Sequence, residues 1–133
     1  MNDDLTVTEV PGDVASVVAR ITASLRGRGI TLFASIDHAA GARAAGLELA
    51  DEVLLVFGNP AVGTSLMQAD PTAGYDLPLR MLVWSDHGAT QVAYQDPGAL
   101  GVRYALDREV TTLVALRGLL QHLVAEAAGG GPR

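Results

Sequence analysis

The chain has 133 residues, of which 49% are hydrophobic and 18% charged, as in a folded globular protein with one core. The formal net charge of −6 opposes binding to nucleic acid or to an anionic membrane, so neither is expected as a partner. The chain has no cysteine, and all nine basic residues are arginine. This composition excludes thiol chemistry, thiolate-bound metals and a lysine Schiff base.

The first third of the chain predicts a strand, a helix and a second strand. Residues 5–10 alternate and are rich in β-branched side chains, which favours a strand. Asp13 is placed to cap a helix over residues 13–27. The apolar side of that helix is formed by Val14, Val17, Val18, Ile21 and Leu25. Alternation from Ile30 to Ile36 predicts the second strand.

The middle of the chain predicts three more strands. The apolar run from Glu52 to Phe57 is typical of a buried strand, and Asn59-Pro60 after it is a helix start. Residues 79–85 and 89–95 are predicted as the arms of a hairpin that turns at Asp86-His87-Gly88. Between these parts we expect a short helical segment from residue 37 and a loop at 74–78.

A mixed connection at 96–106 is expected to lead to a last helix over about 108–126, with Leu120 on its apolar side. Strands and helices do not alternate strictly, and a hairpin requires an antiparallel pair. The sequence therefore predicts an α+β fold, a single mostly antiparallel sheet with the helices at 13–27 and 108–126 on one face. Since no repeat or linker is visible, residues 1–133 are expected to form a single domain.

The location of the protein follows from what the sequence lacks. No apolar run approaches the roughly 18 residues that cross a bilayer. The start, Met1-Asn2-Asp3-Asp4, is acidic where a signal peptide is basic. A cytoplasmic protein is the expectation.

Four motifs together resemble a known bacterial family. They are Ile36-Asp37-His38, Phe57-Gly58-Asn59-Pro60, Leu77-Pro78-Leu79-Arg80 and the strand and turn from Val92 to Pro97. In this order they resemble the signature of the family called domain of unknown function 302, over most of the chain. The resemblance implies an α+β sheet of the TATA-binding-protein-like class, usually as a homodimer, and no established activity. It does not carry DNA binding with it, which the acidic charge opposes.

Asp37 and His38 form the sharpest pair of chemically active residues. A histidine at a strand end can serve as a general base or as a metal ligand, and a nearby carboxylate can tune it. Adjacent residues on a strand point to opposite faces, so Asp37 is not expected to orient His38. We carry His38 as a candidate catalytic residue and Asp37 as a candidate ligand contact. The alternative is a helix-capping aspartate followed by a locally bonded histidine.

Four further residues are candidate ligand contacts. Asn59 starts a helix whose free amides suit an anionic group, or it simply makes a strand-to-helix corner. Arg80 lies in an apolar strand, where its permanent charge must either sit at the sheet edge or find a partner in Asp76, Asp86 or a ligand carboxylate. Trp84 and Tyr94 are interpreted as neighbours across the hairpin, where they line a pocket or fill a core or dimer interface.

His38, Asn59 and Arg80 are predicted to approach one cavity, although each has a local alternative. The first two follow strands and the third begins one, so they meet if the strand of Arg80 runs antiparallel to both others. The three histidines lie far apart and have no metal-ligand spacing, so no metal and no cofactor are expected. No G-x-S-x-G motif supports a hydrolase.

Three functions remain open at this point. The first is a small-molecule-binding domain, acting as a homodimer, with its pocket between the sheet and the helices. The second is a cofactor-independent enzyme in which His38 acts as acid or base on a small, anionic organic substrate. The third is a structural partner protein, for which a filled pocket would be the sign. The sequence ranks them in this order.

Overall fold

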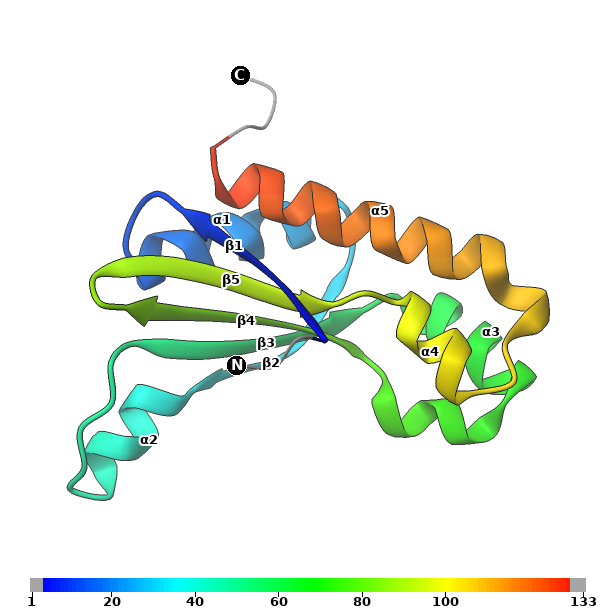
Figure 1. Cartoon of the computed structure of the whole chain (residues 1–133), viewed down its shortest axis with the longest axis horizontal. Coiled ribbons are helices and arrows are strands. Elements are labelled where there is room, and N and C mark those ends of the chain that lie inside the picture. Colours follow the sequence, from blue (N-terminus) through cyan, green and yellow to red (C-terminus); the bar gives the residue numbers. More distant parts are fainter. Residues whose placement is uncertain (1–3, 130–133) are drawn as a thin grey trace.

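The computed structural model describes residues 4–129 (Figure 1). In chain order its elements are β1 (Leu5–Val10), α1 (Val14–Gly27), β2 (Thr31–Asp37), α2 (His38–Ala44), β3 (Glu52–Gly58), α3 (Pro60–Ala69), the 3₁₀ segment η1 (Pro71–Asp76), β4 (Leu79–Asp86), β5 (Ala89–Gln95), α4 (Gly98–Arg103), the 3₁₀ segment η2 (Asp107–Glu109) and α5 (Val110–Ala127). The predicted strands match within one residue at each end. Two segments differ from expectation, since residues 74–76 belong to η1 and residues 98–103 form α4.

The five strands form one sheet in the order β1-β5-β4-β3-β2, and every neighbouring pair is antiparallel. β1 and β2 are therefore the two edge strands, although α1 joins them in sequence. This arrangement confirms the predicted α+β fold and its antiparallel sheet. No helix formed by residues 4–129 combines the length and the apolar composition that crossing a bilayer requires.

Helices α1 and α5 pack on the same face of the sheet, as predicted (Figure 1). We call this the helix face and the opposite side the outer face. The core between the layers contains apolar side chains from α1, from α5 and from alternate strand positions: Val14, Val17, Ile21, Leu25, Leu55, Phe57, Met81, Val83, Val92, Tyr94, Leu120 and Leu123. Leu120 is 1% exposed, which confirms the predicted phase of α5.

The helix starts were set by local capping, as the sequence indicated. The Asp13 side chain accepts from the Ser16 N–H at 2.8 Å and so caps α1. Asp37 caps α2 in the same way through the Ala40 N–H, and Asn59 caps α3 through the Ala61 N–H. In each case the capping oxygen lies within three residues of its donor, which is why sequence alone predicts it.

The β4–β5 hairpin turns at His87 and Gly88, whose φ angles are +51° and +87°. Two residues with positive φ make the tight turn that matches the twist of the strands. The register corrects one prediction. Trp84 pairs with Gln91 and lies on the outer face, whereas Tyr94 lies in the core of the helix face. The two aromatic rings are therefore not neighbours, because alternate residues of a strand point to opposite faces.

Candidate functional site

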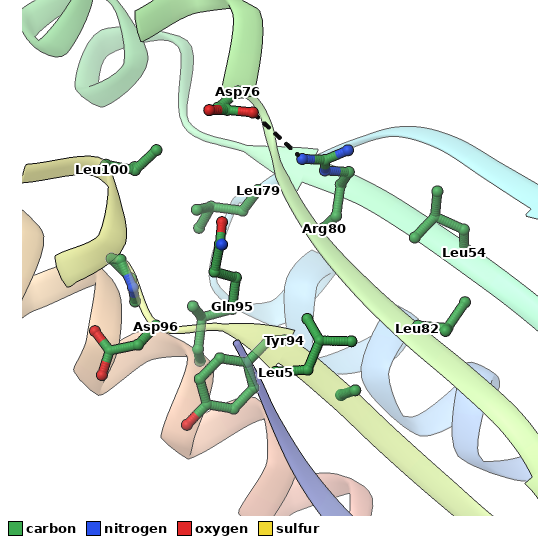
Figure 2. A pocket seen from close by; sticks show the side chains of 13 residues that line it. Leu5, Leu54, Asp76, Leu79, Arg80, Leu82, Tyr94, Gln95, Asp96 and Leu100 are labelled. Carbon is green, nitrogen blue, oxygen red and sulfur yellow. Dashed lines mark ion pairs between the residues drawn. The ribbon is translucent and has the colours of Figure 1, made fainter. Parts of the chain in front are cut away.

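β4 and β5 diverge at one end, and a cavity opens between them. Their ladder runs from the turn only to the pair Leu82–Ala93, although β4 begins at Leu79 and β5 ends at Gln95. The cavity has a volume of about 320 Å³. Strands, η1, α4 and α5 all contribute to its lining: Leu5, Leu54, Asp76, Leu79, Arg80, Leu82, Ala93, Tyr94, Gln95, Asp96, Pro97, Leu100 and Leu120 (Figure 2).

The charged end of this cavity is organised by Asp76, whose side chain is only 7% exposed. Arg103 Nη1 lies 2.8 Å from Asp76 Oδ2, and the Tyr104 hydroxyl donates to the same oxygen at 2.7 Å. Donation to Asp76 raises the pKa of the Tyr104 phenol, with burial and the charge of Asp76 as further causes, so the hydroxyl remains protonated. The negative charge of Asp76 is thus paired with Arg103, and its carboxylate accepts a hydrogen bond from Tyr104.

Arg80 is held only weakly by the same carboxylate. Its Nη2 lies 3.7 Å from Asp76 Oδ1, which is beyond hydrogen-bond distance. Among residues 4–129 no other acidic side chain forms an ion pair with Arg80, and 55% of its side chain is exposed. Figure 2 shows Arg80 turned toward Asp76, at the border of the cavity. The site therefore contains one guanidinium whose donors are largely free to meet a ligand.

Asp96, on the β5 side of the cavity, is committed to a partner. Arg117 Nε and Nη2 both donate to it at 2.9 Å, and the Gly98 N–H donates at 2.7 Å. The hydrogen bonds from Arg117 and then from Gly98 lower the pKa of Asp96. Tyr94 lies beside it, and burial followed by the charge of Asp96 raises the pKa of its phenol. The Asp96 carboxylate is therefore already occupied by Arg117 and Gly98 and adds no unpaired charge to the site.

The remaining surface of the cavity is largely apolar. Leu54, Leu82 and Ala93 are consecutive partners across β3, β4 and β5, so they form a continuous apolar floor on the outer face. Figure 2 shows the Gln95 side chain reaching from β5 toward the segment that carries Leu79 and Arg80. A weakly paired cation beside an apolar floor fits a small organic anion better than a neutral or cationic molecule.

A second cavity of about 260 Å³ lies between the end of β3, α3, η1 and α5. Its lining is almost entirely apolar and includes Phe33, Val62, Leu66, Met67, Pro78 and Leu116. Asn59 lies at this cavity, but its side-chain oxygen already accepts from the Ala61 N–H at 2.9 Å. Leu79 lines both cavities and so stands between them.

The predicted convergence of His38, Asn59 and Arg80 is wrong. β2 runs antiparallel to β3, with Asp37 opposite Val53, so the end of β2 lies beside the start of β3. Asn59 follows the other end of β3. About seven residues at 3.3 Å each, or roughly 20 Å, separate the two ends of the sheet. The prediction assumed that β2 and β3 end at the same edge.

The other candidate residues are distributed as follows. Arg80 and Tyr94 line the first cavity, and Asn59 lines the second. Trp84 lies on the outer face opposite Glu52, away from both linings. Asp37 and His38 are exposed, and Asp37 caps α2. The capping alternative for this pair is the one that the geometry supports.

Sequence reasoning missed Arg103, Tyr104 and Gln95. Tyr104 and Asp76 lie 28 residues apart, and no local sequence pattern indicates their hydrogen bond. The sequence did name Asp76, which lies four residues before Arg80, as one of the candidate partners of Arg80. Within residues 4–129, no three His, Asp or Glu side chains are placed to hold a metal ion.

The sequence matches, over residues 6–125, the family described as "Domain of unknown function DUF302", which confirms the resemblance seen in the motifs. A solved structure with the same fold, the "uncharacterized conserved protein DUF302 from Bacillus stearothermophilus", aligns with a TM-score of 0.82 at 17% identity. The alignment covers 95% of this chain and 99% of that chain.

Among curated proteins, the chain is 39% identical over 107 residues to the fluoride-specific ion channel FluC 1 of Brucella suis biovar 1. The fluoride-specific ion channel FluC 2 of Brucella melitensis biotype 1 gives the same identity over the same length. These matches cover 80% of this chain but only 42% and 40% of the two channels. The chain thus spans about two-fifths of the length of the curated relatives that it matches.

Proposed function

The chain belongs to the DUF302 family, and we propose that this member binds a small organic anion in the cavity between β4 and β5. One observation carries the proposal. Arg80 presents a guanidinium 3.7 Å from an aspartate that Arg103 and Tyr104 already satisfy, beside a floor of Leu54 and Leu82. A ligand carboxylate would give the Arg80 donors the partner that Asp76 does not supply.

The chemistry of the cavity supports a carboxylate with an apolar body. A guanidinium matches a carboxylate through two parallel hydrogen bonds, and such charge-assisted bonds are stronger than neutral ones. The apolar floor gains free energy by removing hydrocarbon from water, at about 25 cal/mol per Å². A volume of about 320 Å³ lies in the range of small-molecule sites.

The test is a titration of the ¹⁵N-labelled protein with sodium 4-phenylbutanoate, followed by NMR and calorimetry. We expect chemical-shift changes around Arg80 and Ala93, and a loss of affinity in Arg80→Gln of about 10- to 100-fold, the value of a charged hydrogen bond. Arg43→Gln, which removes an exposed arginine from α2, is the matched control and should bind as the wild type does. Equal affinity in Arg80→Gln and wild type would refute the proposal.

An inorganic anion is the second candidate ligand, and the names of the Brucella relatives favour it. Those proteins are called fluoride-specific ion channels, and the chain matches about two-fifths of each. Sodium fluoride, titrated at the same ionic strength, separates the two candidates. Shifts around Arg80 with fluoride, and none with 4-phenylbutanoate, would assign the site to the inorganic anion.

The enzyme alternative rests on His38, which is exposed at the start of α2 and lies toward the opposite end of the sheet from Arg80. Among residues 4–129 no hydrogen bond or ion pair engages the His38 side chain, and its neighbour Asp37 caps α2. Binding without chemistry is therefore the function that we put first.

We also propose that two copies of the chain pair through the outer face. One apolar row crosses all five strands in register: Val7, Ala93, Leu82, Leu54 and Ile36. The ends of the row, Val7 and Ile36, are 39% and 43% exposed. Four strand spacings make this row roughly 19 Å long, and the interfaces of obligate homodimers are more hydrophobic than those of transient complexes. The row includes the floor of the cavity, so pairing would also shield a bound ligand.

A further inference from the structure

The divergence of β4 and β5 leaves one rung of the sheet unmade. In the hairpin register Asp86 pairs with Ala89 and the ladder continues to the pair Leu82–Ala93. Hydrogen-bonded pairs alternate along an antiparallel ladder, so the next hydrogen-bonded rung after Leu82–Ala93 is Arg80–Gln95. This rung is missing, as is the intervening pair Met81–Tyr94, although all four residues lie within strands. On their other sides these strands remain paired, β4 with β3 and β5 with β1.

The peptide groups at the missing rung point into the gap. The Ser85 N–H donates to the Asp51 carbonyl at 2.8 Å, so Ser85 turns its peptide groups toward the β3 side. Successive residues of a strand turn their peptide groups to opposite sides. Arg80 lies five residues before Ser85, an odd number, so it turns its N–H and C=O toward β5. Leu82, three residues from Ser85, likewise turns its peptide groups toward its β5 partner Ala93. Ala93 and, two residues on, Gln95 therefore turn theirs toward β4.

We infer that the missing rung recognises an amide in the ligand, so that the preferred ligands are N-acyl amino acids. This inference rests on the proposed function, because Arg80 holds the carboxylate. A trans amide directs its C=O and its N–H to opposite sides. Its oxygen accepts from the Gln95 N–H while its N–H donates to the Arg80 C=O. The ligand thus replaces one of the two direct bonds of the missing rung, from the Gln95 N–H to the Arg80 C=O, by two hydrogen bonds of the same direction.

This arrangement explains why the missing rung between Arg80 and Gln95 lies beside the Arg80 guanidinium. In an extended N-acyl amino acid one carbon separates the amide nitrogen from the carboxylate. The N–H that donates to the Arg80 carbonyl is therefore close to the carboxylate that pairs with the Arg80 guanidinium. The acyl part then lies over the apolar floor of Leu54 and Leu82. Peptide ligands add to sheet edges through the same main-chain hydrogen bonds.

The first test compares three probes of nearly equal shape. N-benzoylglycine carries both groups, 4-phenylbutanoate has methylenes in place of the amide, and N-benzoylglycinamide lacks the carboxylate. We expect N-benzoylglycine to bind about 10-fold more tightly than 4-phenylbutanoate, since each net hydrogen bond contributes a factor of roughly 2 to 10. N-benzoylglycinamide should bind at least as weakly as N-benzoylglycine binds to Arg80→Gln.

The second test removes the backbone donor alone. Gln95→Pro deletes the N–H that faces the gap, and proline is tolerated where a strand N–H has no ladder partner. Gln95→Ala deletes the side chain and keeps the N–H, and so is the matched control. We expect Gln95→Pro to lose affinity for N-benzoylglycine by about 5- to 10-fold relative to Gln95→Ala, and to bind 4-phenylbutanoate as the control does.

Hydrogen exchange in the wild-type protein provides a test that needs no variant. The Gln95 amide should exchange much faster than the Ala93 amide in the free protein, and N-benzoylglycine should slow it. Equal affinity for N-benzoylglycine and 4-phenylbutanoate, with no protection of Gln95, would overturn the inference and leave the anion site intact. Failure of every carboxylate to bind would instead overturn the proposed function.

Discussion

Arg103 and Asp76 form the shortest ion pair of the candidate site, with Nη1 2.8 Å from Oδ2, and this pair leaves Arg80 at 3.7 Å from the same carboxylate. Arg103 therefore controls how strongly Asp76 competes for Arg80. In Arg103→Gln the carboxylate loses its closest cation, attracts Arg80 more strongly and repels an anionic ligand. We expect the affinity for 4-phenylbutanoate to fall several-fold, and the loss to shrink at high salt because exposed charges are screened.

The control for this prediction is Arg108→Gln, which removes an exposed arginine from η2 at unchanged net charge relative to Arg103→Gln. Calorimetric titrations at low and high salt provide the measurement. If both variants lose affinity equally, the effect comes from net charge alone, and the competition between Arg103 and Arg80 has no part in binding.

Leu120→Ala should destabilise the fold by about 2 to 5 kcal/mol, the range for truncating a buried leucine. Leu120 is 1% exposed and packs in the core between α5 and the sheet. Urea denaturation followed by circular dichroism measures the change in unfolding free energy. Val114→Ala truncates a side chain of the same helix that is 54% exposed, so its effect should be much smaller. A change below about 1 kcal/mol for Leu120→Ala would contradict the packing.

We expect the Asp96–Arg117 ion pair to make a pH-dependent contribution to the free energy of unfolding. The hydrogen bonds from Arg117 hold the pKa of Asp96 below its ordinary value of 3.8. A carboxyl group with a lowered folded-state pKa stabilises the fold above its unfolded-state pKa, and this stabilisation is lost as the pH falls through the folded-state value. Asp96→Asn should therefore unfold at lower urea than the wild type at pH 7.

Between pH 7 and pH 2 the difference between Asp96→Asn and the wild type should shrink as the pH falls through the lowered folded-state pKa of Asp96, because the wild-type carboxyl becomes protonated. Asp107→Asn, at an exposed position in η2, is the control and should follow the wild type at both pH values. A constant difference from pH 7 to pH 2 would mean that Asp96 contributes through packing or neutral hydrogen bonds instead of through its charge.

Ile36→Glu should convert the proposed dimer to a monomer. Ile36 ends the apolar row of the outer face, is 43% exposed and lies outside the cavity lining, so a charge there should disturb association more than folding. Size-exclusion chromatography with light scattering measures the mass. Val102→Glu places the same charge at an 88% exposed position on α4 and should leave the mass unchanged. A monomeric wild type at every concentration would contradict the proposal.

His38→Ala should change neither the affinity for 4-phenylbutanoate nor the melting temperature. The side chain is exposed, lies toward the opposite end of the sheet from Arg80 and is not among the residues that line the cavity. Calorimetric titration and thermal unfolding measure both quantities. Loss of binding in this variant would support the enzyme hypothesis, in which His38 acts directly on a substrate.

The sequence by itself determined the local elements of this protein. Asp13 and Asn59 cap their helices through donors two or three residues away, and the hairpin turn depends on His87 and Gly88 alone. The alternation of apolar residues placed the strands, and the helical spacing of α5 placed Leu120 in the core. All of these depend on interactions within a few residues, which a single sequence displays. The resemblance of its motifs to one family correctly added the fold.

The tertiary structure alone decided which strand ends meet. The segment between β2 and β3 turns back at the end of the sheet where β2 finishes (Figure 1), so the two strands are antiparallel and His38 lies far from Asn59. The seven residues of α2 span only about 10 Å, and no local pattern reports the direction in which such a connection returns. The divergence of β4 from β5 is equally hidden, because Arg80 and Gln95 have ordinary strand sequences. Long-range pairing of strands decides both features, and with them where the cavity opens.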